Sequence, residues 1–344
     1  MNWLVRSTTE EEGHAIVGLM RDAGLHPDPD PAYLQWKYWL PTELWEGSRS
    51  FVLADGPKLF AHGAIVPGTL RSDSAEARVI HIIDWAAREQ AGGGGILLMN
   101  YVARFADFLL GIGGSRHTLE ILPRLGYQHC GEVRGYVRAL SPVAVLRSVS
   151  RPRWRVVPRF ARSVVWSVTA PGGSFADWSV RRLGVADVDQ LSDVLPVAKT
   201  GISVFGRSSA LFRFALSCPF VSVELYAMER SGQIGGYFML SHVPGQVRIA
   251  DLWMSSADSA DWRAAIFAAV HQAKTVGGVA EVAAWSSESA LSAAFEECGF
   301  HQRFTRPIFL RSVRGAPLPQ GGIRVQMIDN DAYYLHSTQR ELWA

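Results

Sequence analysis

The stretch Gln90-Ala91-Gly92-Gly93-Gly94-Gly95 lies between two apolar segments of different character. The run before it, 79–83, reads Val-Ile-His-Ile-Ile and predicts a strand, because β-branched residues dominate it. The run after it, 96–102, predicts a helix. A strand that ends in glycines and turns directly into a helix leaves backbone N–H groups unpaired at the positive end of the helix dipole. The stretch therefore predicts an anion site suited to phosphate.

The spacing of the glycines separates this site from two common phosphate motifs. No Gly-Lys-Ser/Thr follows, and the Gly-x-Gly-x-x-Gly of dinucleotide folds has a different spacing and a downstream acidic residue. The spacing present is Gln-x-x-Gly-x-Gly, formed by Gln90, Gly93 and Gly95. Since glycine has no Cβ, the backbone here can approach a pyrophosphate closely.

This spacing resembles the coenzyme A loop of the GNAT family of N-acetyltransferases, which lies between the fourth strand and the helix that follows it. The downstream segments agree with the resemblance: a strand at 108–113 and a Leu-Gly-Tyr turn at 125–127. It implies acetyl-CoA, or another acyl-CoA, as co-substrate, and no metal. The cofactor-binding residues that it implies are Trp85, Ala86, Gln90, Ala91, Gly92, Gly93, Gly94, Gly95 and Ile96.

Three positions depart from the family pattern. Ala87 stands where the family often has proline, and Gln90 where it usually has arginine. The tyrosine that often serves as general acid is replaced by Leu122. Catalysis by that tyrosine is therefore not expected here.

Composition bounds the class of protein. With 344 residues, 48% of them hydrophobic, the chain has material for two ordinary domains. Its three cysteines show no short spacing, which argues against a disulfide framework and for a reducing compartment. Neither a signal-peptide core nor an apolar run of about 20 residues occurs, so we expect a cytoplasmic protein without integral membrane association.

The basic residues are unevenly spread. The formal net charge is +2, yet the segment 143–172 carries Arg147, Arg151, Arg153, Arg155, Arg159 and Arg162 and no acidic residue. Nucleic-acid binding by a whole basic domain is thus not expected. The segment could form a patch for phosphate, an acidic carrier or an anionic membrane, but a solvated linker is the favoured interpretation. Two of its prolines, Pro152 and Pro158, argue against one long amphipathic helix.

A weak internal repeat divides the chain into two α/β copies. A hairpin at 51–66 and another at 223–240 are each followed by an apolar strand with an acid, Asp84 or Asp251, and then by a helix, a strand and a closing helix. We therefore expect two tandem GNAT-like domains, 1–142 and 173–314, each a mixed, mostly antiparallel sheet flanked by helices. Residues 143–172 form the linker between them. Residues 315–344 form a tail that could cap the assembly or reach the substrate cleft.

The copies differ where the cofactor would bind. Aligning Asp84 with Asp251 places Ala257, Ala260 and Trp262 at the positions of Gln90, Gly93 and Gly95. The surrounding Ser/Asp run reads as an ordinary helix N-cap. We expect no coenzyme A in the second copy.

Three side chains are candidate catalytic bases. Asp84 and His81 are three residues apart, so a regular strand would point them to opposite faces, and only one of them would meet the substrate. Asp84 could equally be a turn cap, and His81 a buried core histidine. His117 lies at the next strand-to-helix junction and is a third candidate. The aromatic run 33–39, Tyr-Leu-Gln-Trp-Lys-Tyr-Trp, could line an acceptor pocket, although core packing is the commoner explanation.

These observations predict an N-acyltransferase that moves an acetyl or related acyl group from acyl-CoA to a primary amine of a small molecule, such as an amino sugar. Attack would be direct, since no activated serine or cysteine is evident. Two alternatives remain: a non-catalytic module that senses acyl-CoA or binds a partner, and an aminoacyltransferase of the Fem type. The oligomeric state is not predicted.

Overall fold

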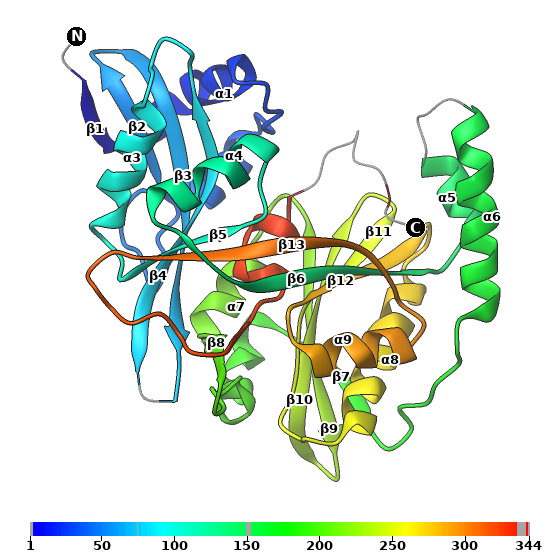
Figure 1. The fold of residues 1–344 in the computed structure, drawn as a ribbon. Helices are drawn as coiled ribbons and strands as arrows, with labels where there is room; N and C mark the ends of the chain where they lie inside the picture. Colours follow the sequence, from blue (N-terminus) through cyan, green and yellow to red (C-terminus); the bar gives the residue numbers. More distant parts are fainter. Residues whose placement is uncertain (1–2, 74, 149–152, 336–341, 343–344) are drawn as a thin grey trace.

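The computed structural model describes residues 3–73, 75–148, 153–335 and 342, which form one mixed sheet with helices on both faces (Figure 1). The first half contributes β1 (Leu4–Ser7), β2 (Ser50–Asp55), β3 (Lys58–Arg71), β4 (Glu76–Ala87), β5 (Phe108–Ile112) and β6 (Gln128–Ala139). The second contributes β7 (Ser179–Leu183), β8 (Ile202–Phe205), β9 (Ser222–Arg230), β10 (Gln233–Val243), β11 (Gln246–Met254), β12 (Glu281–Ser286), β13 (His301–Ser312) and β14 (Gly322–Arg324).

The helices connect these strands in the order that the sequence predicts. In the first half they are α1 (Gly13–Asp22), α2 (Pro31–Leu34), the π-helical turn η2 (Gln35–Trp39), α3 (Gly94–Ala103) and α4 (Arg116–Ile121). In the second they are α7 (Ser209–Leu216), α8 (Ser259–Thr275) and α9 (Ser289–Glu297). The 3-10 segments are η1 (Glu10–Glu12), η3 (Pro123–Leu125), η4 (Val185–Val194), η5 (Met327–Asp329) and η6 (Asp331–Tyr333). Both predicted hairpins form, as β2–β3 and β9–β10.

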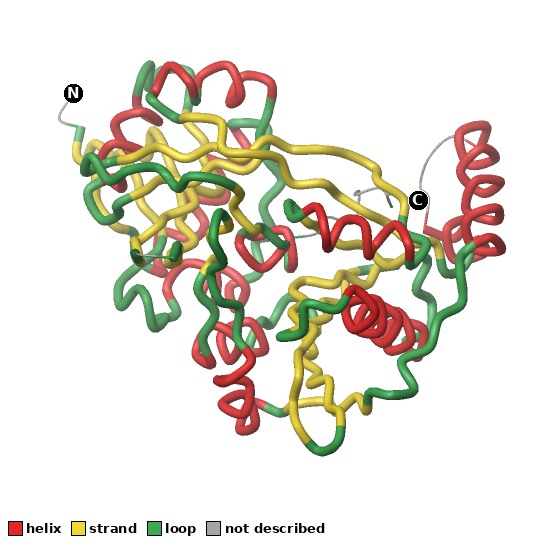
Figure 2. Tube along the Cα trace, turned by 60° about the horizontal axis from the view of Figure 1, so that its bottom comes forward, coloured by secondary structure: helices red, strands yellow, loops and turns green. Residues whose placement is uncertain are grey.

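The two halves exchange their last strands. The order across the sheet is β1-β2-β3-β4-β5-β13-β6-β12-β11-β10-β9-β7, so β13 lies between β5 and β6, and β6 pairs with β12. A view turned by 60° shows these long strands running from one half into the other (Figure 2). Each half contains a hairpin followed by a parallel strand pair, in the predicted order, but element order alone cannot reveal which half a terminal strand joins. One sheet therefore spans both predicted domains.

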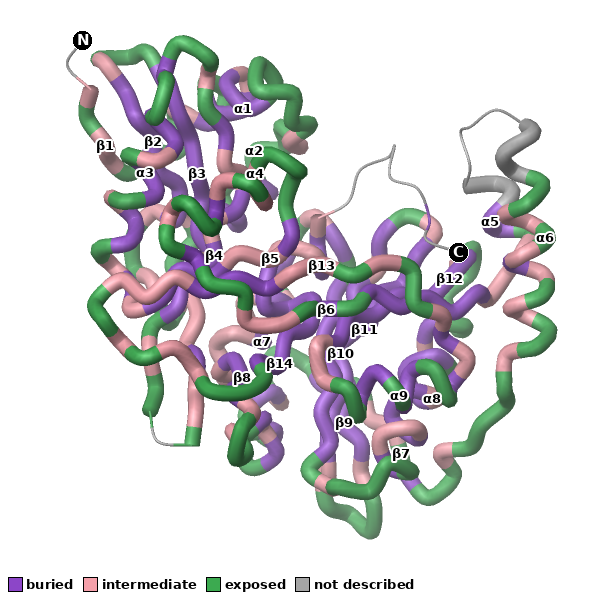
Figure 3. The backbone as a smooth tube through the Cα atoms, viewed as in Figure 1, coloured by how far each residue is buried: buried purple, intermediate pink, exposed green. Residues whose placement is uncertain are grey.

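The first half buries both faces of its sheet. Val79 and Ile83 of β4 belong to the core that contains Ile16 and Leu19 of α1, whereas Ile80 belongs to the core that contains Leu98 of α3. This alternation gives β4 an α1 face and an α3 face. In Figure 3 the central strands are correspondingly buried and the outer helical surfaces exposed.

The Arg-rich linker contains two helices, so the expectation against one long helix is not contradicted, but Pro158 does not end the second helix as expected of a proline. It forms α5 (Pro142–Ser148) and α6 (Arg153–Thr169), and α6 continues through Pro158. Pro152 lies outside the described residues. An internal proline removes one helical hydrogen bond. Packing offsets this loss, because Trp166 stacks on His301 of β13 with a centroid separation of 4.0 Å and packs against the cluster of Val137 and Ala139 on β6.

Candidate functional site

The strands β4 and β5 form a fork. They pair in parallel only where Val79, Ile80 and His81 lie beside Phe108, Leu109 and Leu110. Beyond His81, β4 continues to Ala87 with β3 as its partner on the other side. Within the described part of the chain, no other segment hydrogen-bonds to this stretch of β4 on the side away from β3. The fork thus leaves a strand edge open along one side.

The glycine loop lies at the open end of the fork. Gly93 is the residue before α3 and has φ +80, a left-handed conformation that favours glycine. The N–H groups of Ala91, Gly94, Ile96 and Leu97 bond to carbonyl groups within the loop. Among the hydrogen bonds of the described residues, none involves the N–H of Gly92, Gly93 or Gly95. No acidic residue lies in the first turn of α3, so the loop can accept an anion.

The four glycines have two different functions. A Cβ on Gly94 would lie 2.8 Å from Leu53, and one on Gly95 would lie 2.8 Å from the indole of Trp85. The Trp85 Nε1–H also donates to the Gly95 carbonyl at 3.1 Å, which fixes β4 to α3. A Cβ on Gly92 or Gly93 would meet nothing within 4 Å. Gly94 and Gly95 are therefore needed for packing, and Gly92 and Gly93 form the accessible surface of the loop.

The other predicted cofactor residues border the same region. Trp85 and Ala86 end the open strand, Gln90 is exposed, Ala91 is buried below the loop and Ile96 is half-buried in the first turn of α3. The structure therefore brings the whole predicted set together at the mouth of the fork.

Asp84 interrupts the regular alternation of β4. Its φ is +50, and the register between β3 and β4 shifts at this point. The bulge turns the Asp84 side chain to the α1 face, where Lys37 Nζ lies 2.6 Å from Oδ2 and the Tyr38 hydroxyl donates to the same oxygen at 2.7 Å. The buried His62 imidazole supports the bulge, since Nδ1 lies 3.1 Å from the Asp84 carbonyl oxygen and Nε2 lies 2.9 Å from Ser50 Oγ.

The ion pair keeps Asp84 charged. Burial alone would raise the pKa of this carboxyl, but the Lys37 charge and the hydrogen bonds from Lys37 and Tyr38 outweigh burial and lower it. Burial likewise opposes the charge of Lys37, and Asp84 outweighs it, so the pKa of Lys37 lies well above its usual value. The Lys37 ammonium is also 5.4 to 5.6 Å from the ring centroids of Tyr33, Tyr38 and Tyr334. Asp84 is thus a fixed anion within an aromatic enclosure.

His81 lies on the same face as Asp84, contrary to the expectation that the two side chains point to opposite faces. The reason is the bulge, which reverses the direction that regular pleating would give Asp84. His81 is 8% exposed, and its Nδ1 has no hydrogen-bond partner. Burial lowers the pKa of His81 to about 4, so the imidazole is neutral near pH 7.

His117 is separated from these two residues. It is exposed in the first turn of α4, and Leu119 of this helix packs on the α3-face core. Leu122, at the position of the family's tyrosine, is 3% exposed and belongs to the same core.

A groove opens on the α1 face of the fork, between the halves. Two adjoining pockets form it, and both are lined by Leu44, Val66, Pro67, Leu211 and Ile328. One extends to Lys37 and Ile83, the other to His81 and Leu110. We call this depression the interhalf groove.

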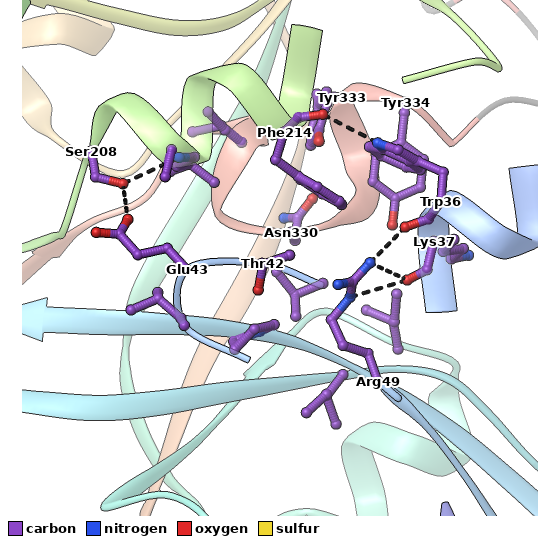
Figure 4. Close-up of a pocket in the computed structure, with 18 residues that line it drawn as sticks. Trp36, Lys37, Thr42, Glu43, Arg49, Ser208, Phe214, Asn330, Tyr333 and Tyr334 are labelled. Atoms are coloured by element: carbon purple, nitrogen blue, oxygen red, sulfur yellow. Dashed lines mark hydrogen bonds between the residues drawn. The ribbon is translucent and has the colours of Figure 1, made fainter. Parts of the chain in front are cut away.

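Both halves build the wall of the groove (Figure 4). Ser208 before α7 donates to Glu43 at 2.5 Å, and Trp36 stacks on Phe214 with a centroid separation of 4.6 Å. Arg49 donates to the carbonyl groups of Trp36, Lys37 and Leu40 and so caps the end of η2. Burial lowers the pKa of Arg49 to about 10.

The sequence did not identify several residues of this site. Lys37 and Tyr38 lie in the aromatic run that the sequence singled out, but nothing in that run indicates a buried partner 46 or 47 positions away. His62 gives no local signal, because an isolated histidine in an apolar strand is more often a core residue. The groove residues from 208–214 and 328–334 come from the second half, and only folding brings them here.

The described residues contain neither a candidate metal site nor a candidate membrane-spanning helix. No group of three histidine, cysteine, aspartate or glutamate side chains there could hold a metal ion. Nor does any helix in these ranges have the length and apolarity to cross a membrane.

Comparison with known proteins yields matches only at the level of structure. No family model matches the sequence, and no curated protein matches it. A GCN5-related N-acetyltransferase from Anabaena variabilis is similar with a TM-score of 0.60 and 12% identity, over 91% of this chain and 73% of that one. The N-myristoyltransferase of Saccharomyces cerevisiae, solved with myristoyl-CoA, gives a TM-score of 0.63 and 12% identity, over 90% and 82%.

A third solved structure, a probable N-acyltransferase of unknown function from Enterococcus faecalis, gives a TM-score of 0.56 and 12% identity, over 91% of this chain and 73% of that one. All three alignments cover both halves. Together with the fork and the glycine loop, they show that this chain has the fold shared by GCN5-related N-acetyltransferases and N-myristoyltransferase.

Proposed function

We propose that this protein is an N-acyltransferase that transfers an acyl group from acyl-CoA to a primary amine of a small molecule. The observation that carries the proposal is the fork. It joins an anion-binding glycine loop at one end to the α1 face, where the interhalf groove opens and where the fixed Asp84 carboxylate borders a separate, neighbouring pocket that shares Lys37 with the groove.

Different residues of the first half bind different parts of acyl-CoA. The free N–H groups of Gly92, Gly93 and Gly95 hold the pyrophosphate, and the open edge of β4 pairs with the extended arm of the cofactor. The bound acyl-CoA supplies a thioester as the electrophile. The bulge at Asp84 then places the reacting carbonyl group between the fork and the groove.

The acid–base roles are proposals from the same geometry. Asp84, held anionic by Lys37 and Tyr38, attracts the substrate ammonium. His81 is neutral and has an unpaired ring nitrogen, so it accepts the proton, directly or through one water. His117 is the rival base, and its exposed position on α4 argues for a smaller effect.

The groove supports an acceptor with a ring or an apolar body. Trp36, Phe214, Tyr333 and Tyr334 line it together with aliphatic residues. An amino sugar stacked on one of these rings is the acceptor that the sequence favours. The predicted cytoplasmic location belongs to the same proposal.

One specific observation favours a second candidate, a non-catalytic acyl-CoA sensor. Leu122 is buried where the family has a catalytic tyrosine, and the Asp84 carboxylate already has a partner. Native mass spectrometry of the purified protein, followed by acyl transfer assays with a panel of amines and acyl-CoA chain lengths, tests both candidates. Bound coenzyme A with amine-dependent release of free thiol supports the enzyme. Tight binding with no transfer to any amine supports the sensor, and binding of neither coenzyme A nor acyl-CoA overturns both.

A further inference from the structure

The second half contains the same fork, but the chain's own tail fills it. Strands β11 and β12 pair in parallel from Gln246 to Ile249 and from Glu281 to Ala284, and β11 then continues alone on this side to Met254. In the repeat alignment Leu252, one residue after Asp251, corresponds to Trp85. The C-terminal tail, drawn in red at the centre of Figure 1, contacts this stretch of β11.

The Gln326 side chain pairs with Leu252 as a strand neighbour would. Its Oε1 accepts from the Leu252 N–H at 3.0 Å, and its Nε2 donates to the Leu252 carbonyl at 3.0 Å. On the other side of the fork, the Val325 carbonyl accepts from the Ser287 N–H at 3.3 Å, and the Ser287 hydroxyl accepts from the Val325 N–H at 2.7 Å. Residues 323–326 thus contact both strand ends of the fork.

Arginine side chains hold the tail on either side of this contact. Arg324 donates to the Leu252 carbonyl and pairs with Glu288 at 2.6 Å, and its guanidinium lies over the rings of Trp253 and Trp262. Arg207 joins Asp329 of the tail to Asp251 of β11, both at 2.7 Å. The residue that replaces the loop glycine, Trp262, is therefore part of the tail's binding site.

From this anchor the tail reaches the interhalf groove. The carbonyl of Tyr333 accepts from Ser241 at 2.6 Å, which fixes the turn. Asn330, Tyr333 and Tyr334 then line the groove, and the Tyr334 ring lies 5.6 Å from Lys37 Nζ of the first half.

We propose that the fork of the second half is a permanent docking site for residues 323–329, and that this docking determines acceptor specificity by positioning Asn330, Tyr333 and Tyr334. The specificity part rests on the proposed acyl transfer. The docking part does not, because it concerns contacts within the chain.

The test compares Gln326→Leu with Gln320→Leu in the full chain. Gln326→Leu removes both bonds to Leu252 at similar volume, whereas Gln320 is an exposed residue earlier in the same tail. Amide hydrogen exchange should rise in 250–254 and 323–335 only in Gln326→Leu. In assays, the acceptor KM should rise about tenfold, the factor that corresponds to one unsatisfied buried group, while the acyl-CoA Kd stays within about twofold.

Tyr334 variants separate positioning from folding. Tyr334→Phe keeps the ring and should retain the acceptor preference, whereas Tyr334→Leu should change the ranking of amines with unchanged acyl-CoA affinity. Unchanged exchange in Gln326→Leu overturns the docking. Altered exchange with an unchanged acceptor KM overturns the specificity role. If Gln326→Leu shows the exchange effect but the wild-type protein binds no acyl-CoA, the proposed function alone is overturned.

Discussion

At the residue scale, the four glycines of the loop are not all explained by the approach of a phosphate. The sequence explains all four glycines by the approach of a phosphate, but only Gly92 and Gly93 are open. Replacing Gly95 with tryptophan to imitate the second copy would force a bulky side chain against Trp85, so a loss of binding there would reflect misfolding. Gly92 is the cleaner position, because its φ is not in the left-handed region.

We expect Gly92→Glu to weaken acyl-CoA binding by at least about tenfold, because a carboxylate beside the loop repels the pyrophosphate. Gly92→Ala adds only a Cβ in open space and serves as the control for folding. Titration calorimetry measures both, with thermal unfolding alongside. Equal affinity in Gly92→Glu and Gly92→Ala would remove the loop from the cofactor site.

Because Asp84 is the counter-ion of the buried Lys37, replacing it should lower the stability of the protein as well as any activity. Asp84→Asn leaves the Lys37 ammonium buried without a counter-ion, so we expect a loss of about 3–5 kcal/mol in the free energy of unfolding. The double variant Lys37→Met, Asp84→Asn should regain most of it. Glu120→Gln, which breaks the exposed pair with Arg116, should change stability by at most about 1 kcal/mol. Urea unfolding measures all three, and a fully stable Asp84→Asn would show that Lys37 does not depend on the carboxylate.

The buried imidazoles predict a stability that depends on pH. Burial lowers the pKa of both His62 and His81 to about 4, whereas an unfolded chain titrates near 6.5. Between these values the unfolded state binds more protons, so the free energy of unfolding decreases as the pH falls from about 6.5 to 4. Each histidine contributes up to about 3 kcal/mol to this loss. His81→Gln should flatten the profile in this window, and an unchanged slope would contradict the assignment.

At the scale of elements, the sequence predicted the helices and strands that follow from local patterns, but not the features that depend on contacts between distant segments. The hairpins, the strand before the loop and α3 follow from alternation, turn residues and glycine spacing. The N-cap of α8 is confirmed, since Asp258 accepts from the Ala260 N–H at 2.8 Å. The bulge at Asp84 was not predictable, because a positive φ at aspartate has no reliable local signal. The sequence did not predict α6 either, because proline has a low helix propensity; packing of Trp166 outweighs the cost of Pro158.

The exchanged strands make the first half dependent on the second. Strand β6 pairs with β12 and β13, and β5 pairs with β13, so a chain that ends near Pro142 leaves both without these partners. We expect this fragment to aggregate, because β5 is an apolar edge with unpaired backbone groups. Sedimentation and acyl-CoA titration check this. A soluble fragment with full acceptor turnover would show that β6 can pair with β5 instead.

At the scale of the whole molecule, the two halves contain the same fork between two parallel strands, but only the second fork is filled by the tail. This difference predicts how many acyl-CoA molecules one chain binds. The first fork is open along β4, whereas the second holds Gln326 and Val325 between its strands. Titration should therefore give one acyl-CoA per chain. Replacing Trp262 with glycine should not create a second site, because Arg324 and Gln326 still fill the fork and Asp258 caps the helix where a phosphate would lie. Two equivalents bound to the wild-type chain would contradict the closed second fork. A second equivalent gained by Trp262→Gly alone would show that the indole, and not the tail, keeps it closed.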